Sequence, residues 1–236
     1  MRKHDLANGN GGAAVEKETS PFRAGDTLTR AEFLRRWEQN SQIKYAELIG
    51  GIVYMPSPTT FLHGETQGEV ACWLGTYAAN TEGVKHGTNS TTFMEQDSPQ
   101  PDEYLRILPE CGGAVRPAGK YLRGAAELIA EICLSSAAYD LHQKLKLYEK
   151  AGVQEYLAVL MYEQQIRWHC LGESGYELLE PTRNLVWKSS VFPGLWLDSK
   201  ALLAGDSAKL LRTLNRGLRS PEHAAFVKKL ARKKKK

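Results

Sequence analysis

The sequence predicts an α/β domain in which a mixed β-sheet is flanked by helices. Two nearly continuous apolar runs, residues 127–134 and 155–161, are typical of strands that are covered on both faces. Between them, residues 138–151 show helical spacing of apolar side chains, and Gly152 stands where a helix C-cap belongs. This strand–helix–strand order, combined with hairpins elsewhere in the chain, predicts a layered domain with a mixed sheet.

The N-terminal half contributes two helices and a hairpin. The segment Thr-Arg-Ala-Glu at residues 29–32 is a capping box, and the apolar residues behind it predict a helix over 30–38. Gly50 and Gly51 separate two apolar runs, which indicates a tight hairpin within residues 44–55. Apolar residues at helical spacing predict a second helix over about 60–79.

The remaining segments are shorter. Strands are expected at four further places: residues 90–94, 103–108, 166–171 and 176–179. A glycine pair and two prolines favour a loop over residues 108–122. The run Phe-Pro-Gly at 192–194 marks a turn before a last short strand. Helices are expected near the C-terminal end of the sequence, at 199–203, at 207–218 and from Pro221 onward.

The chain of 236 residues fits one domain with tails. Residues 1–25 lack periodicity and are rich in Gly, Asn, Ala and charge, so a disordered tail is expected there. We assign residues 26–205 to the main domain and 206–231 to a helical extension. Residues 232–236 are all basic and form a tail. That tail has two interpretations: it is a solvated terminus, or it is attracted weakly and in a salt-sensitive way to phosphate backbones.

The composition is that of a globular protein outside the membrane. Hydrophobic residues make up 42% and charged residues 25%, and the formal net charge is +4. None of the four cysteines is paired at zinc-finger or redox-motif spacing. The first twenty residues are polar, unlike a signal peptide, and no apolar run approaches the ~18 residues of a membrane helix. A cytoplasmic protein with free thiols and no membrane contact is therefore expected.

One carboxylate stands out as a candidate functional group. Glu131 lies inside an otherwise apolar strand, and a carboxylate there is costly to bury unless it is paired or bound to a metal ion. Asp102 opens another expected strand. Two carboxylates at short range repel each other, and a divalent cation such as Mg²⁺ or Mn²⁺ relieves that repulsion. Such an ion polarises a phosphate and activates a water molecule.

Lys144 is the expected cationic partner of these carboxylates. It lies four residues after Asp140, on the border of the buried side of the expected helix, and can stabilise developing negative charge. Each residue also has a plain structural reading. Asp140 and Lys144 can form a surface ion pair, Glu131 can reach solvent at a strand end, and Asp102 can simply begin a strand.

The order Pro101-Asp102, then Glu131, then a lysine on the next helix resembles the PD-(D/E)XK nuclease superfamily. Within it, the chain resembles the Uma-type restriction endonuclease family of bacteria, over roughly residues 28–227. The matching segments are LTRAEFLRRWE, KYAELIGGIVYMPSP, PQPDEYLRI, ELIAEICLSSAAYDLHQKLKLYEKAGVQEYLAV, SVFPGLWLD and LRSPEHAAFV. This resemblance implies a restriction-endonuclease-like mixed β-sheet flanked by helices.

The resemblance also implies residue roles. Asp102 and Glu131 would bind the metal ion, and Lys144 would be the catalytic lysine. Glu47 would add an acidic group near the metal, and Asp140 and His63 are weaker additions around the site. The sequence departs from the superfamily pattern at Cys133, which stands two residues after Glu131 where a lysine is usual. The lysine role therefore moves to Lys144.

The leading hypothesis is a metal-dependent endonuclease that hydrolyses phosphodiester bonds, with DNA as the expected substrate. The alternative is a nucleic-acid-binding protein of the same fold with weak or absent catalysis. A third reading is a nuclease for RNA or damaged ends, with bases stacked on aromatic residues that are more often core: Tyr45, Tyr54, Trp168 and Trp187. A homodimer would suit cutting of both strands of a duplex.

Overall fold

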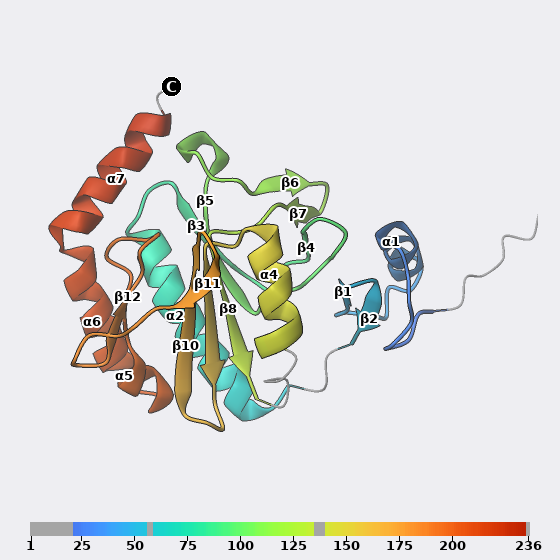
Figure 1. The fold of residues 1–236 in the computed structure, drawn as a ribbon, viewed down its shortest axis with the longest axis horizontal. Helices are drawn as coiled ribbons and strands as arrows, with labels where there is room; N and C mark the ends of the chain where they lie inside the picture. The colour runs from blue at the N-terminus through green and yellow to red at the C-terminus, as the bar shows by residue number, and fades with distance from the viewer. Residues whose placement is uncertain (1–20, 56–58, 135–139, 235–236) are drawn as a thin grey trace, which may run out of the picture.

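The computed structural model describes residues 21–55, 59–134 and 140–234. Its centre is a six-stranded sheet in the order β11-β10-β9-β8-β5-β3 (Figure 1). The strands are β3 (Val84–Thr88), β5 (Glu103–Ile107), β8 (Leu128–Cys133), β9 (Glu155–Leu160), β10 (Gln165–Gly172) and β11 (Gly175–Leu178). Strands β8 and β9 run parallel, and the other neighbours are antiparallel. The mixed sheet that the sequence predicts is therefore confirmed.

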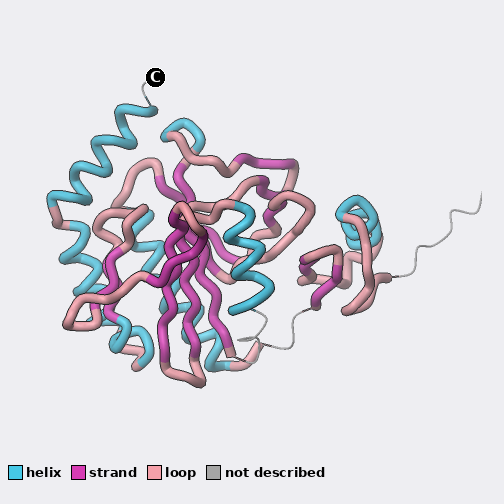
Figure 2. Tube along the Cα trace, in the orientation of Figure 1, coloured by secondary structure: helices cyan, strands magenta, loops and turns pink. Residues whose placement is uncertain are grey.

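Helices cover both faces of this sheet (Figure 2). Alternate residues of a strand point to opposite faces. Leu128, Ala130 and Ile132 accordingly share a core cluster with helix α2 (Phe61–Ala79). The intervening Ile129 and Cys133 share a second cluster with helix α4 (Leu145–Ala151). Glu131 has the same parity as Ile129 and Cys133, so its carboxylate lies on the α4 face of the sheet.

The segment that leads into α4 differs from the expected regular helix. Residues Asp140–Lys144 form a π-helical turn, η2, directly before α4. Gly152 ends α4 with a φ of +83°, in the left-handed conformation that glycine adopts without strain, as its C-cap position predicts. Residues 138 and 139 of the expected helix lie outside the described residues.

The N-terminal part forms a small unit beside the sheet (Figure 1). Helix α1 (Arg30–Glu38) begins at Thr29, whose hydroxyl accepts a hydrogen bond from the Glu32 N–H, as the capping box predicts. Strands β1 (Glu47–Ile49) and β2 (Ile52–Tyr54) form the predicted hairpin. Residues 21–25 depart from the expected tail, because Phe22 is buried and stacks on Phe33 of α1.

The expected loop over residues 108–122 is wrong. This segment holds the short helix η1 (Pro109–Cys111) and strand β6 (Arg116–Ala118), and strand β7 (Tyr121–Arg123) starts at its end. The two strands β6 and β7 form a three-stranded sheet with strand β4 (Thr92–Phe93), in the order β4-β7-β6. Pro117 signals a loop, yet β6 is an edge strand, where a missing N–H is tolerated. The helix of residues 60–79 is confirmed by α2, whereas strand β3 was not predicted.

The C-terminal part packs against the α2 side of the domain. Strands β12 (Val186–Lys188) and β13 (Trp196–Asp198) pair, and helices α5 (Ser199–Leu203), α6 (Ser207–Leu218) and α7 (Pro221–Lys234) follow. Helix α7 includes Arg232–Lys234, so the basic run belongs to the last helical turn for as far as it is described. Across the described ranges, no helix is long and apolar enough to cross a membrane.

Candidate active site

Asp102 and Glu131 meet where strands β5 and β8 diverge. The antiparallel register pairs Glu103 with Ala130, so Asp102 lies opposite Glu131 at the next position. The Asp102 backbone N–H donates to Glu131 Oε2 over 3.3 Å, and the Ile132 N–H donates to Asp102 Oδ2 over 2.9 Å. The two carboxylates thus accept the backbone hydrogen bonds that continue the ladder, which fixes their positions.

Lys144 completes the cluster from η2. Its Nζ donates to Glu131 Oε1 over 3.0 Å and lies 3.1 Å from Glu47 Oε1. The Lys144 side chain is only 7% exposed, so both ion pairs are shielded from bulk water. The expectation that Lys144 borders the buried side and reaches Glu131 is met in this geometry.

Glu47 enters the same cluster from the first strand of the N-terminal hairpin. Its Oε1 accepts a hydrogen bond from the Gln100 N–H over 2.7 Å, beside the contact with Lys144. Gln100 lies two residues before Asp102, so the approach to β5 and the hairpin converge on one point. Four segments that are distant in sequence therefore supply Glu47, Asp102, Glu131 and Lys144.

The two weaker candidates differ in their placement. His63 lies in the first turn of α2, and its Nε2 is 3.4 Å from Asp102 Oδ2. Asp140 begins η2, but its side chain lies outside the described part of the structure. The expected i,i+4 relation between Asp140 and Lys144 assumes an α-helix, and the π-helical turn does not keep that relation.

Tyr148 is a site residue that the sequence analysis did not single out. Its hydroxyl donates to Glu131 Oε1 over 2.6 Å from the first turn of α4. Complete burial, followed by the nearby charges of Glu131 and Glu47, raises the pKa of Tyr148 well above its usual range. The phenol therefore stays protonated and remains a donor. Its position four residues after Lys144 was the signal that could have revealed it.

A second polar network lies behind Asp102, on the other face of β5. Gln67 of α2 donates through Nε2 to the Asp102 carbonyl oxygen over 3.3 Å and to Glu103 Oε1 over 3.2 Å. Glu103 is buried and also contacts His86 Nε2. Sequence reasoning missed this network, because its members lie on three separate elements with no recognisable spacing. It holds the backbone of Asp102 in place.

The donor chemistry of the cluster fits a hard divalent cation. Three carboxylates, Glu47, Asp102 and Glu131, face one lysine, so negative charge is in excess where water is scarce. Mg²⁺ is typically bound through one or two carboxylates, with water and substrate phosphates as its other ligands. Asp102 and Glu131 supply that number. Within the described ranges, no group of three or more His, Cys, Asp or Glu side chains is arranged to hold a metal ion.

The aromatic residues considered for base stacking do not form one surface. Trp168 and Trp187 are buried in the main core, where their rings stack on each other. Tyr54 is half-buried and donates to Gln143 Oε1 over 2.6 Å, whereas Tyr45 is exposed. The two tryptophans are therefore core residues and not base-stacking residues.

The fold is of the restriction-endonuclease-like class. It is similar to a crystal structure from Anabaena variabilis ATCC 29413, titled a putative nuclease belonging to DUF820. The two share a TM-score of 0.55 and 15% sequence identity, over 68% of this chain and 90% of that one. No curated protein matches the sequence. Residues 30–200 match the family model Uma2, described as "Putative restriction endonuclease", and the chain belongs to that family.

Proposed function

We propose that the protein is a metal-dependent endonuclease that hydrolyses phosphodiester bonds in DNA. The observation that carries this proposal is the convergence of Asp102, Glu131 and Lys144 in one shielded cluster. A carboxylate and a lysine in the core of a strand-and-helix layer are costly to maintain for stability alone. The fold and the family description support the same reaction class.

Each residue of the cluster has a distinct task in this proposal. Asp102 and Glu131 would hold Mg²⁺ or Mn²⁺. When bound, that ion supplies Lewis-acid polarisation of the scissile phosphate and lowers the pKa of water. Lys144 carries the positive charge that offsets charge developing on the phosphate. Glu47 and Tyr148 hold Lys144 and Glu131 in place through their contacts at 3.1 and 2.6 Å.

DNA is the proposed substrate because the family is described as restriction endonucleases, which cut DNA. Cutting both strands of a duplex requires two reactions, which a homodimer would supply with one centre per strand. Size-exclusion chromatography with light scattering measures the oligomeric state directly.

The proposal is tested by incubating purified protein with supercoiled plasmid, single-stranded DNA and RNA, each with Mg²⁺, with Mn²⁺ and with EDTA. We expect metal-stimulated nicking or cutting of DNA that is lost in Glu131→Ala and Lys144→Ala proteins. Lys146→Ala is the matched control, since Lys146 lies only two residues after Lys144 but is exposed. Absence of metal-stimulated cleavage by folded wild-type protein on every substrate would reject the enzyme and favour a binding protein of this fold.

A further inference from the structure

The charge of the chain is divided between its two parts. Residues 200–236 contain twelve of the 31 Lys and Arg residues and two of the 27 Asp and Glu residues, a net charge of +10. The whole chain carries +4, so residues 1–199 carry −6. The proposed catalytic cluster lies in this acidic part, which repels a polyanion. The basic part falls almost entirely beyond residue 200, where the family match ends.

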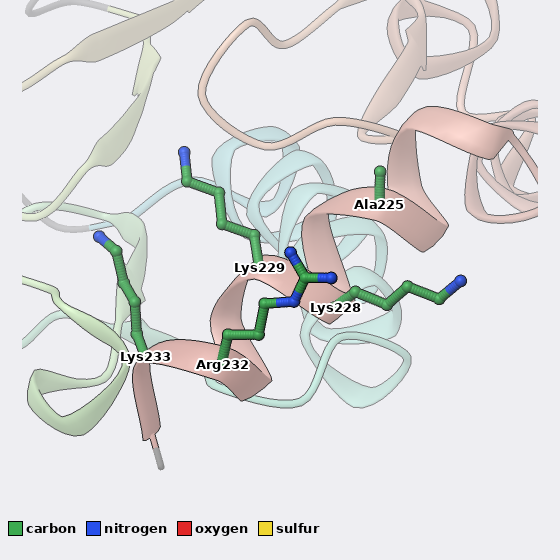
Figure 3. A pocket seen from close by; sticks show the side chains of 5 residues that line it. All are labelled: Ala225, Lys228, Lys229, Arg232 and Lys233. Atoms are coloured by element: carbon green, nitrogen blue, oxygen red, sulfur yellow. The ribbon is translucent and has the colours of Figure 1, made fainter. Parts of the chain in front are cut away.

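Helix α7 concentrates this charge on one stripe. Lys228, Lys229, Arg232 and Lys233 are spaced so that they share one helix face, and all four are exposed. Figure 3 shows them around one hollow beside Ala225, with Lys229 and Lys233 extended to the same side. The opposite face of α7 buries His223, Phe226 and Leu230 against the domain, which fixes the direction of the stripe.

Helix α6 presents a second stripe of the same sign. Lys209, Arg212 and Arg216 line a groove between α6 and the β12–β13 hairpin, together with Lys188. Lys188 Nζ lies 4.0 Å from the centre of the Trp196 ring in this groove. Asp198 is the acidic residue among the groove's lining, and it pairs with Lys209 over 3.3 Å.

Like charges at helical i,i+4 spacing destabilise a helix, and α7 has two such pairs, Lys228 with Arg232 and Lys229 with Lys233. Among the residues that the structure describes, no carboxylate forms an ion pair with these four cations. A helix face that only contacts water does not need a cluster of like charges, because alternating positive and negative charges would stabilise the helix more. Cations repeated along two helices at the surface match the repeating negative charge of a phosphate backbone.

We propose that α6 and α7 form a nucleic-acid-binding surface separate from the catalytic cluster, which contacts the phosphate backbone without reading sequence. The cluster lies on the α4 face of the sheet, whereas α6 packs on α2 at the opposite face. The surface therefore supplies affinity that the acidic centre cannot supply. The proposed function also has nucleic acid as its partner, but this surface only binds it and does not require cleavage.

The test is equilibrium binding of a fluorescent duplex of arbitrary sequence, of its single strand and of the matching RNA, measured by anisotropy in EDTA so that no cleavage occurs. The test variant is K228Q/K229Q/R232Q/K233Q. The control is K85Q/K120Q/R123Q/R167Q, which removes four exposed cations from strands and turns elsewhere. Glutamine keeps helix propensity close to that of the residues it replaces.

If all four α7 cations contact phosphates, the slope of log K against log salt falls by about 3 to 4 in the test variant. Affinity for the duplex at low salt should fall by at least about 100-fold, with little change in the control. Equal losses in both variants, or no loss in the test variant, would overturn the proposal. Binding to anionic lipid vesicles without binding to nucleic acid would overturn it as well. Binding without metal-stimulated cleavage would reject the proposed enzyme and leave this surface standing.

Discussion

The ammonium of Lys144 lies 3.0 Å from Glu131 Oε1 and 3.1 Å from Glu47 Oε1, so one lysine joins the central sheet to the N-terminal hairpin. All three side chains are largely buried, so water and salt screen the two ion pairs only weakly. This arrangement predicts that the same residue affects both catalysis and the stability of the fold.

Lys144→Met should destabilise the protein by about 3–5 kcal/mol, because it leaves two buried carboxylates without their shared cation. It should also lower the cleavage rate by at least about 100-fold, as expected for a lost electrostatic contact to the transition state. Urea denaturation measures the first effect, and single-turnover cleavage at a temperature where circular dichroism shows folded protein measures the second. Folded Lys144→Met protein that cuts at the wild-type rate would remove Lys144 from the mechanism.

Asp102→Asn separates the structural role of Asp102 from its proposed role in metal binding. The amide oxygen of asparagine can still accept the Ile132 N–H, so stability should change by less than about 1 kcal/mol. The negative charge is lost, and affinity for Mn²⁺ should fall by at least about tenfold. Isothermal titration calorimetry with Mn²⁺ and thermal denaturation check the two parts. Unchanged Mn²⁺ affinity together with lower stability would identify Asp102 as a strand-start residue only.

Tyr148→Phe removes a single hydroxyl donor at nearly constant volume. Its bond to Glu131 Oε1 is short, 2.6 Å, and made to a carboxylate, so its loss should cost about 1–3 kcal/mol of stability. Lys144 still contacts Glu131, and activity should therefore fall by less than in Lys144→Met. Urea midpoints and cleavage rates of the two variants, measured side by side, test this order. Activity in Tyr148→Phe as low as in Lys144→Met would give the phenol a direct role in the reaction.

The sequence was informative wherever a pattern is local. The buried strands β8 and β9, the capping box of α1 and the Gly50-Gly51 hairpin follow from the spacing of apolar and turn residues. Glu131 could be singled out because a charge in an apolar strand is a local anomaly. Its nearness to Asp102 and Lys144 was expected from the order of strand and following helix. The β5–β8 register accounts for Asp102, and Lys144 reaches Glu131 from η2.

Features that depend on tertiary pairing could not be predicted. Strand β6 contains Pro117 and is only three residues long, and its partner strand β7 pairs with β4, which has only two residues. The network of Gln67, Glu103 and His86 depends on the packing of α2 against β3 and β5. Residues Asp140–Lys144 form a π-helical turn where an α-helix was predicted, and the hydrophobic spacing of five residues does not distinguish the two.

His223 on α7 should make stability depend on pH. Its Nδ1 donates to the Leu218 carbonyl oxygen over 2.9 Å, and its Nε2 lies 2.9 Å from the Thr81 hydroxyl. Burial lowers the pKa of His223 below its usual value of 6.5, although the bond to Leu218 opposes this shift. Well above pH 6.5 the imidazole is neutral in both the folded and the unfolded state. As the pH falls through 6.5, the unfolded state takes up a proton first, and stability is lost.

We expect urea midpoints to fall between about pH 7.5 and about pH 5.5, and the fall to be smaller in His223→Gln than in wild type. The variant will also lose packing at every pH, so the quantity compared is the change with pH within each protein. His142→Gln is the matched control, since His142 is exposed and its removal should leave the wild-type pH dependence in place. An unchanged pH dependence in His223→Gln would show that other groups cause the acid destabilisation.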